Sequence, residues 1–309
     1  MFLQIETYRN TKLKLANHPQ LDTQKPSKSM PQIISPDNTV LMKGLKSNFS
    51  VAADIRYQHF GQTLQSYSLV AFGKCNFRCS FCFACGSSVL EDGTLPDAEL
   101  MSIEEIDRFI IEEIRAGRII RFSGGEPTLF VNELTHFLKT VRRHNGCSIV
   151  DTNGSQPEAL RHIAMEADII SIDPFKANID SVEQITGISK EYCWDAPLRS
   201  MEELSKCDTS IELKTVLFSP IDLDLLKKTI EILPPKAHWT LKQYLPTRSR
   251  FSGKNSDIQR EKQINDLTPA QPEEMLAVQK QLIQKHSDLK GRLTVVIGSA
   301  RNPSNYHLA

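Results

Sequence analysis

A regular alternation of strand-like and helix-like segments, which begins at Tyr67, constrains the fold of this 309-residue chain more than any other feature. The strand-like segments are short apolar runs, and the segments between them carry apolar residues at helical spacing. Strands that alternate with helices make right-handed crossovers and a parallel sheet. We therefore predict an α/β fold whose strand–helix units form a curved, incomplete barrel. The predicted strands are 68–72, 119–122, 148–151, 167–173, 210–217 and 239–243.

Capping residues mark the helix boundaries. Ser102 and Glu105 form a capping box that opens a helix, and Gly117 is placed to end it. Pro157 suits the first turn of a later helix, because an amide hydrogen at that position has no partner inside the helix. The other predicted helices are 132–144, 196–205 and 223–232.

Three cysteines, Cys75, Cys79 and Cys82, lie at C-x3-C-x2-C spacing on the loop after the first predicted strand. Such a loop can direct three thiolates toward a common point. Three thiolates are one fewer than an ordinary four-iron cluster or a structural zinc site requires, so one metal position stays open. The alternatives are a zinc knuckle, or three small apolar residues without a ligand.

Two further motifs follow the second and third predicted strands. Residues 123–127 read Ser-Gly-Gly-Glu-Pro, and residues 152–154 read Thr-Asn-Gly. Chemistry in barrels of this kind lies at the carboxyl ends of the strands, so we expect both motifs to lie near the cysteines. Glycines let the backbone approach a ligand closely, and their carbonyl groups can accept from an ammonium group. The alternative is a tight turn in each place.

The cysteine spacing and the Gly-Gly-Glu-Pro string together resemble the radical S-adenosylmethionine superfamily. The resemblance covers Tyr67 to about Pro246 and implies a partial (β/α)6 TIM-like barrel with N- and C-terminal extensions. It implies one [4Fe–4S] cluster on the three cysteines, with S-adenosylmethionine bound to the fourth iron. One electron would then cleave the sulfonium, and the resulting 5′-deoxyadenosyl radical would abstract a hydrogen atom from a substrate. A flavodoxin or ferredoxin would supply the electron.

The resemblance also implies roles for individual residues. The loop of Gly124, Gly125 and Glu126 would bind the methionyl amino group of the cofactor, and Phe81 would lie near its adenine. For Phe81 the alternative is core packing. The polar side chains of Thr152 and Asn153 could bond the ribose or the methionine carboxylate, or they could serve only a turn.

A closer resemblance, to glycyl-radical-enzyme activases and their archaeal-type relatives, covers several later segments. It implies a cofactor-binding lysine, here Lys176, although this chain has Asp-x-x-Lys where the activases have Asp-x-Lys. Ser171 and Asp173 alternate on the fourth strand and so share a face. Lys214 and Lys242 are competing cations, and each of the three lysines could instead be solvated. The segments of resemblance are 172–176, 185–187, 213–217 and 239–246.

These patterns predict an enzyme of the oxidoreductase or activase type. The main hypothesis is hydrogen abstraction from a protein glycine. The alternative is modification of a small molecule, nucleotide or peptide, and a remote alternative is a zinc-binding module without catalysis.

Composition narrows the class of protein. Lys plus Arg and Asp plus Glu number 37 each, which argues against nucleic-acid binding through bulk charge. No apolar run has membrane length, and charges interrupt residues 1–15, so we expect a cytoplasmic protein without a membrane anchor. Three further cysteines lack ligand spacing and are interpreted as buried thiols, namely Cys147, Cys193 and Cys207. Cys85 lies three residues after Cys82 and is interpreted as a small residue that lines the loop, with an alternative role as a cluster ligand in a shifted register.

The sequence divides into four stretches. Residues 1–66 are an N-terminal extension, partly irregular, which we expect to pack around the edge of the barrel. Residues 67–246 form the barrel core, and the polar residues 247–266 form a flexible loop. Residues 267–309 supply a last helix and a strand, 293–297, that closes the barrel.

Overall fold

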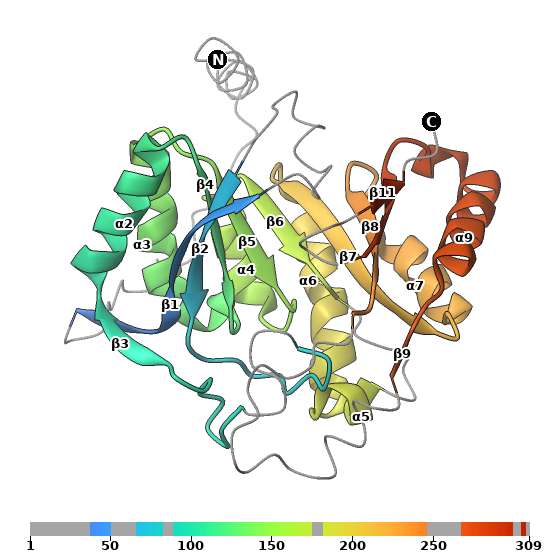
Figure 1. The fold of residues 1–309 in the computed structure, drawn as a ribbon, viewed down its shortest axis with the longest axis horizontal. Coiled ribbons are helices and arrows are strands. Elements are labelled where there is room, and N and C mark those ends of the chain that lie inside the picture. Colours follow the sequence, from blue (N-terminus) through green and yellow to red (C-terminus); the bar gives the residue numbers. More distant parts are fainter. Residues whose placement is uncertain are drawn as a thin grey trace, which may run out of the picture.

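A computed structural model describes residues 38–50, 66–82, 89–174, 182–245, 267–298 and 304–306. Its centre is a curved, mixed sheet in the order β11-β10-β8-β7-β6-β5-β4-β2-β1-β3, with β9 paired to β7 (Figure 1). The strands are β1 (Thr39–Ser50), β2 (Ser66–Phe72), β3 (Glu99–Ser102), β4 (Ile119–Gly124), β5 (Ser148–Thr152), β6 (Ile169–Ile172), β7 (Ser210–Ser219), β8 (His238–Gln243), β9 (Thr268–Pro269), β10 (Leu293–Ile297) and β11 (Ser304–Tyr306).

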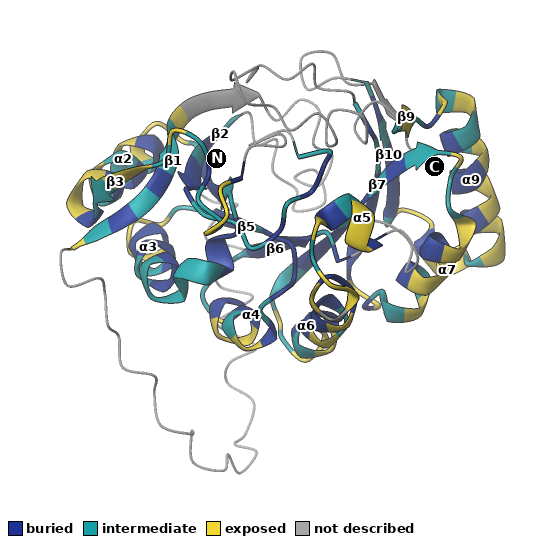
Figure 2. Ribbon diagram, turned by 90° about the horizontal axis from the view of Figure 1, so that it is seen from below, coloured by how far each residue is buried: buried dark blue, intermediate teal, exposed yellow. Residues whose placement is uncertain are grey.

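Helices cover the outer face of this sheet. In Figure 2 they form an arc, with their buried faces turned to the strands and their exposed faces outward. The short elements α5 and η3 lie instead at the carboxyl end of the strands, near α6. The helices are α2 (Ile103–Arg115), η2 (Pro127–Phe130), α3 (Val131–Arg143), α4 (Pro157–Ile163), α5 (Val182–Thr186), the π-helical turn η3 (Glu191–Asp195), α6 (Ala196–Ser205), α7 (Leu223–Ile232), α9 (Pro272–Lys285) and η4 (Ser287–Leu289).

The predicted parallel sheet is confirmed. Parallel pairing runs from β2 through β4, β5, β6, β7 and β8 to β10. Each strand sends alternate side chains to opposite faces. Those that face the helices, such as Phe72, Phe122 and Val150, join the main apolar core with the buried stripes of α2 and α3. The fold is therefore an α/β partial barrel, as the sequence predicts.

Local signals set the helix boundaries as expected. The Ser102 hydroxyl accepts from the amide of Glu105 at 3.2 Å and caps α2. Gly117 follows α2 with φ +78°, a conformation that side-chain-bearing residues rarely adopt. Pro157 occupies the first turn of α4.

Strands from outside the predicted barrel core lie at both ends of the sheet. Residues 38–50 of the predicted N-terminal extension contain strand β1, which pairs antiparallel with both β2 and β3. At the other end the predicted strand 293–297 is β10, which pairs with β8 and extends the sheet. The segments 1–37, 51–65 and 246–266 lie outside the described residues. Within the described residues, no helix is long and apolar enough to cross a membrane.

Candidate functional site

The cysteine loop leaves β2 and runs along the edge of the sheet where the parallel strands end, close to α5 (Figure 1). Backbone hydrogen bonds hold it on two sides. The amide of Cys75 donates to the carbonyl of Gly93 at 2.9 Å. The amide of Arg78 donates to Thr186 at 2.8 Å, and the amide of Ser80 donates to Ile185 at 2.9 Å. The residues on either side of Cys79 are therefore anchored to α5.

The three cysteine side chains lie in a small apolar environment of their own, separate from the main core. Cys79 is 9% exposed, and Cys75 and Cys82 are half-buried. Cys75 and Cys82 contact two neighbouring apolar clusters, one around Phe77 and one around Val89. The amide of Phe77 donates to the Cys75 sulfur at 3.4 Å, an interaction that stabilises a thiolate. These are suitable donors for an iron–sulfur cluster.

The Gly-Gly-Glu-Pro loop packs directly against the start of the cysteine loop. The amide of Gly125 donates to Phe72 at 2.9 Å, and the amide of Glu126 donates to the Lys74 carbonyl at 2.7 Å. A Cβ atom at Gly125 would lie 2.0 Å from the Lys74 oxygen, so only glycine fits there. Gly124 has φ +95° and a similar close approach to Phe72. The two motifs are thus brought together as the sequence predicts.

The carboxylate of Glu126 is held by the protein itself. It is 1% exposed and accepts from the amide and hydroxyl of Thr128, at 3.1 and 2.6 Å. It also accepts from the Thr152 hydroxyl at 2.8 Å and the Asn153 amide at 2.7 Å. Burial raises the pKa of Glu126, and these hydrogen bonds oppose the shift. The side chain therefore joins the ends of β4 and β5, and the predicted contact of this loop with the cofactor falls to its backbone.

Asn153 connects the end of β5 to the cysteine loop. Its side-chain amide donates to Oδ1 of Asn76 at 3.0 Å. Nδ2 of Asn76 donates to the Ser155 hydroxyl at 2.7 Å, and the Ser155 amide donates to Oδ1 of Asn153 at 2.9 Å. These three residues form a closed ring of hydrogen bonds. The roles of Thr152 and Asn153 in cofactor binding stay predictions.

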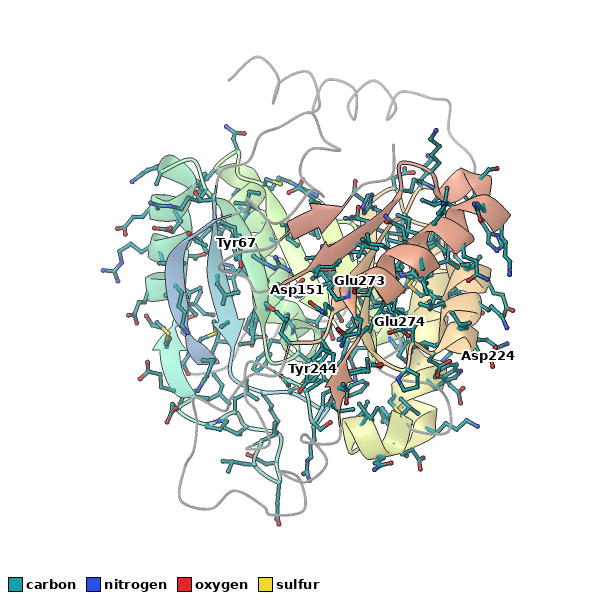
Figure 3. All side chains as sticks on the ribbon, turned by 45° about the vertical axis from the view of Figure 1, so that its right-hand side comes forward. Tyr67, Asp151, Asp224, Tyr244, Glu273 and Glu274 are labelled. Atoms are coloured by element: carbon teal, nitrogen blue, oxygen red, sulfur yellow. The ribbon has the colours of Figure 1, made fainter. Side chains whose placement is uncertain are left out.

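A charged cluster lies on the inner face of the sheet. Asp151 of β5 is labelled among the side chains of the sheet in Figure 3. It accepts from Nε and a terminal nitrogen of Arg121 at 2.6 and 2.9 Å, and from Nζ of Lys214 at 2.6 Å. The Arg121 guanidinium lies 5.2 Å from the ring centre of Tyr67. Burial alone would raise the pKa of Asp151, but the two cations hold it well below its usual value. Lys214 is thus a buried partner of Asp151 and not a solvated lysine.

Ser171 and Asp173 were predicted to share a face with the site. The Ser171 hydroxyl donates to the Glu212 carboxylate at 2.6 Å, and the Thr240 hydroxyl donates to the same carboxylate at 2.9 Å. The amide of Asp173 donates to the Thr152 carbonyl at 3.1 Å, which places it beside the Thr-Asn-Gly turn. Ser171 therefore contributes to the polar inner wall, and Asp173 lies at the rim.

Phe81 belongs to an aromatic row that joins the cysteine loop to β7 and to the residue that follows β8. Its ring meets Phe218 edge-on with centroids 5.3 Å apart, and Phe218 lies 5.0 Å from Tyr244. The side chain is half-buried, so this packing leaves its predicted contact with adenine untested.

The remaining residues named in the sequence analysis are two lysines and four cysteines. Lys176 and Cys85 lie outside the described residues, and Lys242 is half-buried on β8. Cys193 is buried, and burial raises the pKa of its thiol. Cys147 and Cys207 are half-buried.

Several site residues escaped the sequence reasoning, namely Asn76, Arg121, Asp151, Ser155 and Glu212. A signal existed for three of them. Arg121, Asp151 and Glu212 are charges inside otherwise apolar strands, where an uncompensated charge is costly and a partner is expected. Nothing in the sequence pairs Asn76 with Ser155.

Three cysteine thiols on one loop are the donor set of a four-iron cluster that keeps one iron open, since a cluster takes each thiolate at a separate iron. Over the described ranges, no three His, Cys, Asp or Glu side chains form a group that could hold a metal ion. The convergence of the three thiols on a cluster therefore stays a prediction.

Comparison with known proteins gives relatives that share part of the chain. A GTP 3′,8-cyclase of Mesorhizobium japonicum is 30% identical over 131 residues, which are 40% of this chain and 37% of the relative. An S-adenosylmethionine-dependent nucleotide dehydratase of Lacinutrix mariniflava is 25% identical over 225 residues, 65% of this chain and 44% of the relative. The chain thus spans less than half the length of these curated relatives.

Two further comparisons concern the fold and the family. The crystal structure of Streptococcus suis SuiB bound to precursor peptide SuiA has a TM-score of 0.53 and 13% identity, and the match covers 96% of this chain and 61% of that one. This likeness concerns the fold alone. The Radical SAM superfamily matches residues 69–232, more than half of the chain. Together with the cysteine and glycine loops, this match shows that the chain belongs to the Radical SAM superfamily.

Proposed function

We propose that this protein reductively cleaves S-adenosylmethionine and abstracts a hydrogen atom from a nucleotide or another small molecule. Radical SAM enzymes use a [4Fe–4S] cluster and S-adenosylmethionine. The observation that carries the proposal is the direct packing of the cysteine loop on the Gly-Gly-Glu-Pro loop, through Gly125 and the bond from Glu126 to Lys74. The loop that carries the proposed cluster ligands thus packs on the loop whose backbone we propose to contact the cofactor.

The chain's own residues supply binding and position. Cys75, Cys79 and Cys82 would hold the cluster, and backbone groups of Gly124 and Gly125 would meet the methionyl end of the cofactor. When bound and reduced, the cluster supplies the electron that breaks the sulfonium C–S bond.

The substrate class rests on two observations of different kinds. The curated relatives named above are enzymes of nucleotides. The inner wall of the sheet is polar and charged, since it carries the ion-paired Arg121, Asp151 and Lys214. Small polar ligands are oriented by a few such groups. A glycine of a substrate protein, which has no polar side chain, would not require these charged groups for its orientation.

Anaerobic reconstitution with iron and sulfide tests the proposal. We expect about four irons per chain and, with dithionite and S-adenosylmethionine, formation of 5′-deoxyadenosine. GTP, ATP, CTP and UTP carrying deuterium on the ribose would then be added singly. Deuterium in 5′-deoxyadenosine would identify the nucleotide. Zinc retained by four protein donors would contradict the proposal, as would intact S-adenosylmethionine after reduction.

A further inference from the structure

The cysteine loop is held by anchors that flank two of its ligands. Lys74, before Cys75, accepts from the glycine loop through its carbonyl, and Asn76, after Cys75, bonds to the end of β5 through its side chain. Cys79 is flanked in the same way by the backbone bonds of Arg78 and Ser80 to α5. Each of these two thiols therefore projects from a residue whose neighbours on both sides are fixed.

Of these four anchors, the one at Asn76 is the only one made by a side chain. Its amide group uses both ends, since Oδ1 accepts from Asn153 and Nδ2 donates to Ser155. Asn153 and Ser155 are buried, at 8% and 3% exposure, and their own bond closes the ring. A buried polar ring in which each member is satisfied is rigid, because opening it leaves desolvated groups unpaired.

The ring also connects the cysteine loop to the glycine loop by a second route. Glu126 accepts from the backbone amide of Asn153 and from the Thr152 hydroxyl, and Asn153 in turn bonds Asn76. Movement of Asn76 therefore requires movement at the end of β5, which the Glu126 carboxylate opposes. The cysteine loop, the glycine loop and the turn after β5 are therefore joined in one hydrogen-bonded network.

We propose that Asn76 is a positioning residue, which fixes Cys75 relative to the glycine loop through its hydrogen bonds to Asn153 and Ser155. The effect of Asn76 on placement of the cofactor rests on the proposed function. The local restraint itself is a property of the metal-free chain.

The first test is amide hydrogen exchange in metal-free protein. Asn76→Ala should raise exchange in peptides that cover 73–82 and 151–156, because the ring spans both, and should leave the peptide of α9 unchanged. Ser155→Ala should raise exchange in the same two peptides. Asn76→Asp should rescue exchange, since its oxygens can accept from Asn153 and the Ser155 hydroxyl can turn to donate. Ser205→Ala, an exposed serine bonded to the Glu202 carbonyl, is the matched control.

The second test uses the iron-loaded protein. Asn76→Ala should keep wild-type iron content, broaden the electron paramagnetic resonance signal of the reduced cluster, and lower the rate of 5′-deoxyadenosine formation about tenfold. Asn76→Ala combined with Ser155→Ala should cost no more than Asn76→Ala alone, because both changes break the same ring.

Unchanged exchange at 151–156 in Asn76→Ala would overturn the inference, as would additive losses in the double variant. If wild-type protein forms no 5′-deoxyadenosine, the proposed function fails, and the exchange data still decide whether the ring restrains the loop.

Discussion

At the residue scale, the three cysteines differ from the other thiols by their place in the fold. Cys75, Cys79 and Cys82 share small apolar clusters beside the glycine loop. Cys193 lies in one of the same clusters, but its thiol donates to the carbonyl of Ser189 at 3.2 Å. Burial raises the pKa of Cys193, so its neutral thiol is favoured and it is a poor ligand. Position in a cluster therefore does not by itself make a ligand.

Replacement of single cysteines tests this distinction. Cys79→Ala should abolish cluster binding and 5′-deoxyadenosine formation, because two thiolates cannot hold the cube. Cys193→Ala should keep wild-type iron content and lose only packing, about 1 kcal/mol of stability. Iron and sulfide analysis after anaerobic reconstitution measures both. Full iron content in Cys79→Ala would contradict the ligand assignment.

Gly125 gives a second prediction at this scale. In Gly125→Ala the new Cβ would lie 2.0 Å from the Lys74 oxygen, so the glycine loop must move away from the cysteine loop. We expect at least about tenfold weaker binding of S-adenosylmethionine to the iron-loaded protein. Gly117→Ala is the matched control, since it strains a φ of +78° but meets nothing within 4 Å. It should cost about 1 kcal/mol of stability and leave cofactor binding intact. Equal cofactor affinity in the two variants would refute the role of close approach.

At the element scale, the Asp151 carboxylate links three strands through its ion pairs, in addition to the backbone hydrogen bonds of the sheet. It lies on β5 and receives Arg121 from β4 and Lys214 from β7. The Arg121 and Lys214 side chains are 10% and 12% exposed. Two nearly buried cations on one carboxylate make the carboxylate indispensable, because its loss leaves both charges uncompensated.

Asp151→Asn should therefore lower the free energy of unfolding by about 2 kcal/mol at pH 7. Because the pKa of Asp151 in the folded protein lies well below its ordinary value of 3.8, the stabilisation by this carboxylate is fully present above that pH. It is lost as the pH falls from there toward the folded pKa, so variant and wild type should converge in acid. Urea titrations at pH 7 and pH 3 measure the difference. Asp224→Asn, at an exposed pair with Lys227, should change neither value measurably. A constant difference between wild type and Asp151→Asn at both pH values would refute the assignment.

Sequence patterns predicted the elements that depend on local signals. The capping box at Ser102, the apolar stripe of α3 and the strand before the cysteines are all local, and the structure confirms them. Strand β1 was missed as a continuous element, because its pairing partners on β2 and β3 lie between 16 positions (Ser50 and Ser66) and 63 positions (Thr39 and Ser102) away. The ion pair of Asp151 and Arg121 was missed for the same reason, since the two residues lie on neighbouring strands. The ring around Asn76 joins positions nearly eighty residues apart, which no local pattern reveals.

At the scale of the whole molecule, the proposed cluster site lies outside the main core. The main core is formed by the sheet and the helices on its outer face, whereas the cysteines pack with α5 and the loop after it. The fold therefore has its own source of stability, unlike small domains that fold only around a metal. Binding of the cluster should order its surroundings and not the barrel.

Iron removal tests this separation. Anaerobic chelation should leave the far-ultraviolet circular dichroism spectrum and cooperative unfolding nearly unchanged. Amide exchange should rise in peptides 73–82 and 182–195, which contact each other through the bonds of Arg78 and Ser80 to α5. Exchange in α9, which packs on β10 and β8, should stay constant and serves as the internal control. Cooperative loss of the whole fold on chelation would show that the metal supports the barrel itself, as in a metal-dependent domain. Because α5 would loosen while the outer helices stay ordered, we expect the metal-free protein to regain its iron and activity on reconstitution without refolding.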